Sequence, residues 1–159
     1  MKQLEHLPAH GKTSDTCWET PAWLYDLLNS EFDFQYDLAA IKENAKTKFF
    51  KNSLNKEWHK LKGWLWLNPP FSGIREWVEK ADHEMKLGAK IVMLFPANAI
   101  GAPYMKKCIP SEIRFLSCRP IFRHTFKKSL MQFSSIILIF DKNKKRKKFS
   151  FIEKPKELK

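Results

Sequence analysis

One apolar run that stops at two consecutive prolines constrains the fold of this chain more than any other feature. Trp64-Leu65-Trp66-Leu67 has the continuous hydrophobicity of a strand buried on both faces. The strand must end at Asn68-Pro69-Pro70-Phe71, because proline has no N–H for a sheet ladder and does not fit a helix interior. The next segment predicts a helix capped by Ser72, since one helical face would carry Ile74, Trp77, Val78, Ala81 and Met85.

Other strands and helices alternate in the same way along the chain. A first helix is predicted to begin with Thr20 as N-cap and Pro21 at the first helical position, and Gly88 is predicted to end the second helix. Residues 46–63 are left unassigned. We expect strands at 34–38, 90–95, 112–116 and 135–140, a short helix at 103–108, and a hairpin turn at 141–145 before a final edge strand near Phe149 and Phe151.

This alternation favours an α/β fold with an open, mostly parallel sheet and helices on both faces. In such sheets ligands bind beyond the carboxyl ends of the strands. Asp37, Asn68 and Pro96 each stand at or just after the end of a predicted strand, so we expect one crevice to hold all three.

The length of 159 residues fits one domain and leaves no room for a large separate recognition domain. We expect a flexible N-terminal arm at residues 1–15, one domain at 16–152 and a basic tail at 153–159. The sequence has neither an apolar run of membrane-spanning length nor a signal-peptide core at its start, so we expect no membrane contact and no export. Three cysteines without a CxxC pair favour reduced thiols in a cytoplasm and predict no metal site.

The charge balance points to a polyanionic partner. Lys and Arg number 29 against 17 Asp and Glu, which gives a formal net charge of +12. Such an excess is typical of proteins that bind nucleic acid through phosphate contacts. The candidate contacts flank a predicted loop, with a solvated basic face as the alternative interpretation: Arg119, Arg123, Lys127 and Lys128.

The chemistry open to Asn68-Pro69-Pro70-Phe71 follows from its parts. An aromatic amine is a poor nucleophile because its lone pair is delocalised into the ring. Two acceptors aimed at its N–H groups would draw the nitrogen towards tetrahedral geometry, and the Asn68 side-chain carbonyl and a proline-fixed backbone carbonyl are such acceptors. Phe71 offers a flat face on which a planar base can stack. An ordinary strand-to-helix turn is the alternative interpretation.

This tetrapeptide resembles the (D/N/S)-P-P-(Y/F/W) motif of amino-methyltransferases that use S-adenosylmethionine. The chain also resembles the phage-type DNA N6-adenine methyltransferase (Dam) family, whose segments recur in order over roughly residues 14–140. The matching segments are Ser14-Asp15-x-x-Trp18-x-Thr20-Pro21, Phe32-x-Phe34-x-x-Asp37-x-Ala39-Ala40-x-x-x-Asn44-Ala45, Trp58, Trp66-x-Asn68-Pro69-Pro70-Phe71, Trp77-Val78-x-Lys80-Ala81, Pro96-Ala97, and Ile113-Arg114-Phe115-Leu116 through Arg119 and Phe122.

The resemblance implies a reduced, Rossmann-like class I methyltransferase fold with S-adenosylmethionine as cofactor. It implies that a methyl group passes to the N6 amine of an adenine flipped out of double-stranded DNA, in the bacterial host cytoplasm if the protein is phage-encoded. We expect a monomer or a weak homodimer. The resemblance implies a catalytic loop at Asn68, Pro69, Pro70 and Phe71, and cofactor contacts at Trp18, Thr20, Pro21, Asp37, Ala39 and Asn44.

Departures from the family pattern leave other functions open. No glycine follows the first strand, at Asp37-Leu38-Ala39-Ala40. Asn98 stands where relatives often carry arginine, and Cys118 stands where glycine is common; both motivate a nucleic-acid-binding protein that has lost catalysis. Asn-Pro-Pro-aromatic loops also serve methyltransferases of RNA adenine or protein glutamine. A basic tail further suits an interaction protein that docks on an acidic partner.

Overall fold

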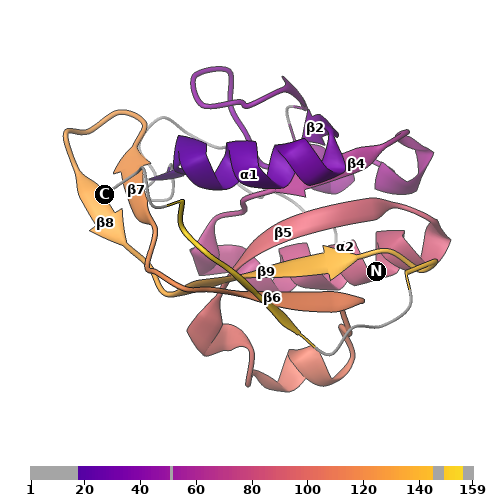
Figure 1. The fold of residues 1–159 in the computed structure, drawn as a ribbon. Helices are drawn as coiled ribbons and strands as arrows, with labels where there is room; N and C mark the ends of the chain where they lie inside the picture. The colour runs from indigo at the N-terminus through magenta and orange to yellow at the C-terminus, as the bar shows by residue number, and fades with distance from the viewer. Residues whose placement is uncertain (1–17, 51, 145–148, 156–159) are drawn as a thin grey trace.

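A seven-stranded sheet forms the centre of the molecule (Figure 1), with strand order β10-β6-β9-β5-β4-β2-β3. The computed structural model describes residues 18–50, 52–144 and 149–155. All neighbouring strands run parallel except β9, which is antiparallel to both β5 and β6. The strands are β2 (Phe34–Asp37), β3 (Lys48–Phe49), β4 (Trp64–Leu67), β5 (Lys90–Pro96), β6 (Glu112–Leu116), β9 (Ser135–Phe140) and β10 (Ser150–Ile152).

Each face of this sheet carries one α-helix, α1 (Ala22–Phe32) on one side and α2 (Ile74–Leu87) on the other. Alternate side chains of a strand point to opposite faces, so Leu65 and Leu67 pack in the core beneath α2 and Trp66 packs beneath α1. The predicted apolar face of α2 is buried at every position. The prediction of a largely parallel α/β sheet with helices on both faces is therefore confirmed.

The starts of both helices differ from the sequence-based expectation. Pro21, rather than Thr20, is the N-cap of α1, and its carbonyl accepts hydrogen bonds from the N–H groups of Leu24 and Tyr25 at 3.1 Å each. Gly73, rather than Ser72, is the N-cap of α2, because Phe71–Gly73 forms a 3₁₀ turn first. Gly88 does end α2 as predicted, with a φ of 121°.

A second, three-stranded antiparallel sheet was not predicted from the sequence. It has the order β1-β7-β8, from β1 (Trp18–Glu19), β7 (Ile121–His124) and β8 (Leu130–Gln132). Trp18 lies opposite His124 in this sheet. Phe122 is buried in the core beneath α1, which anchors the small sheet to the large one.

The predicted hairpin at 141–145 is wrong, although the final edge strand is confirmed. Strand β10 pairs in parallel with β6 instead of folding back on β9. Glu112 of β6 gives the reason, because its buried carboxylate accepts hydrogen bonds from Arg114 Nε at 2.8 Å and Ser150 Oγ at 3.1 Å and pairs with Lys144 at 2.7 Å. Burial opposes ionisation of Glu112, but Arg114 and Lys144 outweigh it and lower its pKa to about 2.

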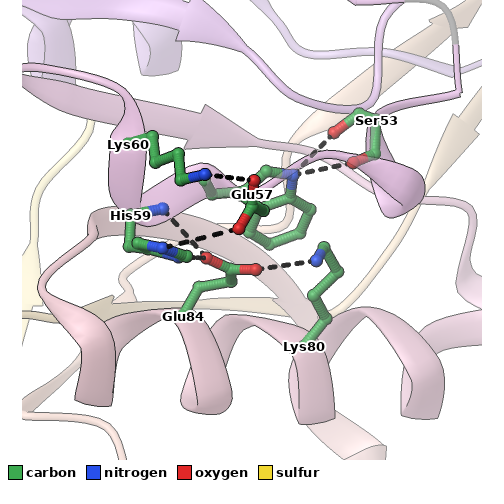
Figure 2. A network of polar contacts seen from close by, with 7 residues as sticks. Ser53, Glu57, His59, Lys60, Lys80 and Glu84 are labelled. Carbon is green, nitrogen blue, oxygen red and sulfur yellow. Dashed lines mark hydrogen bonds and ion pairs between the residues drawn. The ribbon is translucent and has the colours of Figure 1, made fainter.

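Residues 46–63 are held to α2 by a buried carboxylate. Figure 2 shows Glu84 accepting hydrogen bonds from the His59 backbone N–H at 2.9 Å and from Lys80 Nζ at 2.8 Å. The His59 ring contacts the same carboxylate at 2.7 Å, and buried Trp58 donates to the Ser53 carbonyl at 2.9 Å. Within this segment, and in the later loops, the chain forms 3₁₀ turns at Ser53–Asn55, Trp58–Lys60, Ala97–Ala99 and Pro103–Lys106. The last of these replaces the predicted helix at 103–108.

The expected arm at residues 1–15 lies outside the described residues, as does most of the expected tail at 153–159. No helix in the described part of the chain combines the length and the apolar character that a membrane crossing requires.

The Glu84 network predicts a large stability difference between two glutamates on the same helix. Glu84→Ala should lower the free energy of unfolding by about 2–4 kcal/mol, because it removes a buried acceptor from the half-buried donors of His59 and Lys80. Glu79→Ala is the matched control, since Glu79 is exposed and pairs with exposed Arg75; its cost should stay below about 0.5 kcal/mol. Chemical denaturation measures both, and equal costs would contradict the role given to Glu84.

Candidate functional site

Two adjoining clefts open where the carboxyl ends of β2 and β4 meet the small sheet. Both clefts are open to solvent, and the empty space in them is about 480 Å³ for the first and about 1130 Å³ for the second. Trp18 and Asn68 line both clefts, so these two side chains mark the boundary between them.

The first cleft has a buried carboxylate on its wall. Asp37 ends β2 and is only 4% exposed. Its carboxylate accepts hydrogen bonds from the backbone N–H groups of Lys46 at 3.2 Å and Ala39 at 3.4 Å, which fold the 38–46 loop around it. Burial raises the pKa of Asp37 to about 6, and the two backbone donors offset only part of this effect.

Asn44 ties the same loop to the small sheet. Its side-chain oxygen accepts a hydrogen bond from the Ile41 N–H at 2.9 Å, and its amide group donates to Thr125 Oγ1 at 3.2 Å. Thr125 follows β7 directly, so this contact ties the 38–46 loop to the turn between β7 and β8, whose Lys127 and Ser129 line the second cleft. Asn44 therefore shapes the cleft as well as lining it.

The orientation of the Asn68 amide is fixed by its two partners. Nδ2 donates to the Trp18 backbone carbonyl and to Thr20 Oγ1, each at 3.0 Å. A backbone carbonyl can only accept a hydrogen bond, so the reversed amide would place two oxygens against each other. Asn68 Oδ1 is thus left as an acceptor, and no residue in the described part of the chain donates to it.

Aromatic rings line the second cleft around the proline loop. Phe71 packs edge-on against Phe133, with ring centroids 5.4 Å apart. Phe133 also packs edge-on against Trp18 and Phe122, with ring centroids 5.7 Å and 5.4 Å apart. Flat faces and edges of this kind suit a planar aromatic ligand.

Most of the predicted site residues come together here. Those lining the first cleft are Trp18, Thr20, Asp37, Ala39, Asn44, Asn68 and Pro70. Those lining the second are Trp18, Asn68, Pro69, Phe71 and Lys127. Pro21 lies outside both linings, as do Pro96, Asn98, Arg119, Arg123 and Lys128. The expected crevice therefore contains Asp37 and Asn68 without Pro96.

Sequence reasoning missed the wall that the small sheet contributes. His124, Met131 and Phe133 line the second cleft, and Lys46 lines the first. The sequence holds no clear signal for this wall, because Ile121-Phe122-Arg123-His124 does not alternate between apolar and polar residues. In the structure, burial does alternate through β7, which places Phe122 and His124 inward and Arg123 outward. Among the described residues, no three His, Cys, Asp or Glu side chains converge as metal ligands do.

Comparison with known proteins gives one family. The sequence model described as DNA N-6-adenine-methyltransferase (Dam) matches residues 9–159. The chain is similar to the "DNA N-6-adenine-methyltransferase" of Haemophilus phage HP1 (strain HP1c1), with 29% identity over 89 residues, 52% of this chain and 50% of the relative. It is also similar to the protein of the same name from Escherichia phage T1, with 34% identity over 85 residues, 51% of this chain and 36% of the relative. The matched region thus spans half of the first relative's length and a smaller share of the second's.

The burial of Asp37 predicts an unusual titration. Its carboxyl should change charge near pH 6, because burial disfavours the ionised form. The folded-state pKa lies above the ordinary 3.8, so this group's contribution to the free energy of unfolding should fall as pH rises from about 4 to 6. Carbon-13 NMR of the aspartate carboxyls measures the midpoint, and the missing signal in Asp37→Asn assigns it. A midpoint at or below about pH 4 would contradict the burial argument.

Proposed function

Since this chain belongs to the DNA N-6-adenine-methyltransferase (Dam) family, we propose that it transfers a methyl group from S-adenosylmethionine to the N6 amine of adenine in double-stranded DNA. The observation that carries the proposal is the amide of Asn68, which lies between the two clefts with its oxygen left as an acceptor. The accompanying fold is the reduced, Rossmann-like class I methyltransferase fold. A largely parallel sheet with a site at the carboxyl ends of its strands supports it.

The first cleft would take the cofactor, and the polar groups of its lining support this assignment. The Asp37 carboxylate accepts two backbone N–H groups and keeps lone pairs for hydroxyl donors, which the cofactor's ribose carries. Pro21 would act indirectly, by starting α1 directly behind the segment that lines the cleft. The contacting residues would be Trp18, Thr20, Asp37, Ala39 and Asn44.

The second cleft would receive the target base. Leaving the duplex costs the base a few kcal/mol, and stacking on Phe71 would return about 1–3 kcal/mol. Asn68 Oδ1 and the Pro69 carbonyl would accept hydrogen bonds from the two N–H groups of the amine, while Pro70 fixes the backbone between them and Phe71. When bound, S-adenosylmethionine supplies an electrophilic methyl group on a sulfonium sulfur.

Catalysis would then rest on orientation and on acceptors fixed before the base arrives. Asn68 needs no reorganisation, since the Trp18 carbonyl and Thr20 hydroxyl already hold its amide. The excess proton leaves the nitrogen after methylation, so the site needs no general base to start the reaction.

Basic side chains around the small sheet would bind the DNA backbone. Arg119, Arg123, Lys127 and Lys128 are all exposed. Arg123 points away from Phe122 and His124, whereas Lys127 lines the second cleft. Phosphate contacts from these residues would position the duplex without reading its sequence.

Replacing the proposed acceptor should separate turnover from cofactor binding. Asn68→Ala should lower kcat on duplex DNA by about 10²-fold or more, because the amine loses an acceptor that matters in the transition state. The Kd for S-adenosylmethionine should change far less than kcat does, since β1 remains paired with β7 when its contacts with Asn68 are lost. Asn98→Ala is the control, because Asn98 is exposed and lines neither cleft. Equal kcat values in the two variants would refute the role of Asn68.

The basic residues predict a change in salt dependence. Arg123→Ala and Lys128→Ala should each reduce the slope of log affinity for duplex DNA against log salt concentration by about 1, because each removes one phosphate contact. Lys106→Ala removes one positive charge from an exposed position in the turn Pro103–Lys106, which is not part of the small sheet, and should leave the slope unchanged. Fluorescence anisotropy at several salt concentrations measures the slopes. Identical slopes in all three variants would exclude this face as the DNA contact.

A further inference from the structure

A buried histidine on the wall of the second cleft has no role in the mechanism above. His124 ends β7, is 3% exposed and lines the cleft together with Asn68 and Phe71. Its ring packs edge-on against Trp18, with centroids 5.1 Å apart. Trp18 and His124 also face each other across the β1–β7 pairing, so the position of the ring is set by both backbone and side-chain contacts.

The hydrogen bonding of His124 fixes which ring nitrogen carries the proton. The backbone N–H of Phe126 donates to Nδ1 at 3.1 Å, so Nδ1 acts as the acceptor. In a neutral imidazole the proton is then on Nε2. Nε2 is buried and has no hydrogen-bond partner within the described part of the chain. Buried donors are rarely left unmatched. Because His124 lines the second cleft, a ligand there can supply the partner once the side chains that cover Nε2 in the free protein move aside.

His124 Nε2–H adds a hydrogen-bond donor to the two acceptors of the proline loop. Asn68 Oδ1 and the Pro69 carbonyl can only accept hydrogen bonds, which suits an amine. His124 Nε2–H can only donate, which suits a ring nitrogen with a lone pair. Adenine carries this combination, because N1 and N7 both flank its N6 amine, and the amine edge of cytosine carries it too. Guanine and thymine present a carbonyl oxygen where the amine would lie.

We propose that His124 is a base-recognition residue, whose Nε2–H donates to one of the two ring nitrogens that flank the amine of the target base, N1 or N7. This inference rests on the proposed function and names a further contact in the same site. His124 would hold the ring plane while Asn68 and Pro69 hold the amine. Bases with a carbonyl at that edge would leave the acceptors facing another acceptor.

The test pairs protein variants with altered substrates. His124→Phe keeps a flat ring against Trp18 and removes the donor, and His124→Gln places an amide N–H near the original Nε2 position. Substrates are duplexes whose methylated adenine has been mapped and then replaced by 7-deazaadenine, 1-deazaadenine or, as a control, 3-deazaadenine. Methyl transfer gives kcat/KM for each pair, and thermal melting and S-adenosylmethionine affinity report whether the variants stay folded.

For normal adenine, His124→Phe should lower kcat/KM by about 10- to 100-fold with little change in cofactor affinity, and His124→Gln should recover part of the loss. In the unaltered protein, either the 7-deaza or the 1-deaza substrate should show a similar loss, which should disappear in His124→Phe because the partner is already gone. 3-Deazaadenine should behave alike in both proteins.

If His124→Phe and each deaza substitution lower kcat/KM independently, so that their losses multiply for both 7-deazaadenine and 1-deazaadenine, the contact is overturned. The proposed function would remain intact. A second outcome would also overturn the contact. If both His124 variants have a lower melting temperature or a weaker cofactor affinity, and no deaza substrate changes the effect of His124→Gln on kcat/KM, the ring has a structural role. Absence of transfer to normal duplex DNA by the unaltered protein would overturn the proposed function and this inference together.

Discussion

Two hydrogen bonds from the Asn68 amide tie the end of β4 to the segment that contains β1. One partner is the Trp18 carbonyl and the other is the Thr20 hydroxyl, both at 3.0 Å. Because β1 belongs to the small sheet, this amide joins the two sheets at the boundary of the two clefts. The proposed chemistry depends on the same contact, since it directs the remaining oxygen of Asn68. One amide group thus has two roles: its Nδ2 joins the two sheets, and its Oδ1 is the proposed catalytic acceptor.

The large sheet keeps this junction rigid. Strands β4 and β5 are almost wholly buried, with α2 covering one face and α1 the other. The prolines after Asn68 prevent the strand from continuing, so the loop leaves a closely packed core at a defined place. Asn44 adds a second tie between the sheets through Thr125. Both clefts are therefore lined by segments tied to this core, as a site that works by orientation requires.

Local patterns in the sequence explain how much of this arrangement could be predicted. The buried strand at 64–67, the apolar face of α2 and Gly88 as its end depend on nearest neighbours and on burial, and each was predicted correctly. The start of α1 was misjudged because Thr20 bonds to Asn68, 48 residues away, which no local capping rule contains. Strand β10 was placed beside the wrong neighbour because the buried charge of Glu112 attracts Lys144 and Ser150. The small sheet was missed because its strands are two to four residues long, which is too short for periodicity to show. His124 consequently had no visible place in the site.

The most direct test of the proposed function is transfer of radiolabelled methyl from S-adenosylmethionine to unmethylated duplex DNA, followed by digestion and separation of the nucleosides. RNA and protein acceptors belong in the same experiment, because Asn-Pro-Pro-aromatic loops serve those substrates in other enzymes. The account predicts label in N6-methyladenine from DNA. Label confined to RNA or to glutamine, or cofactor binding without transfer to any acceptor, would contradict it.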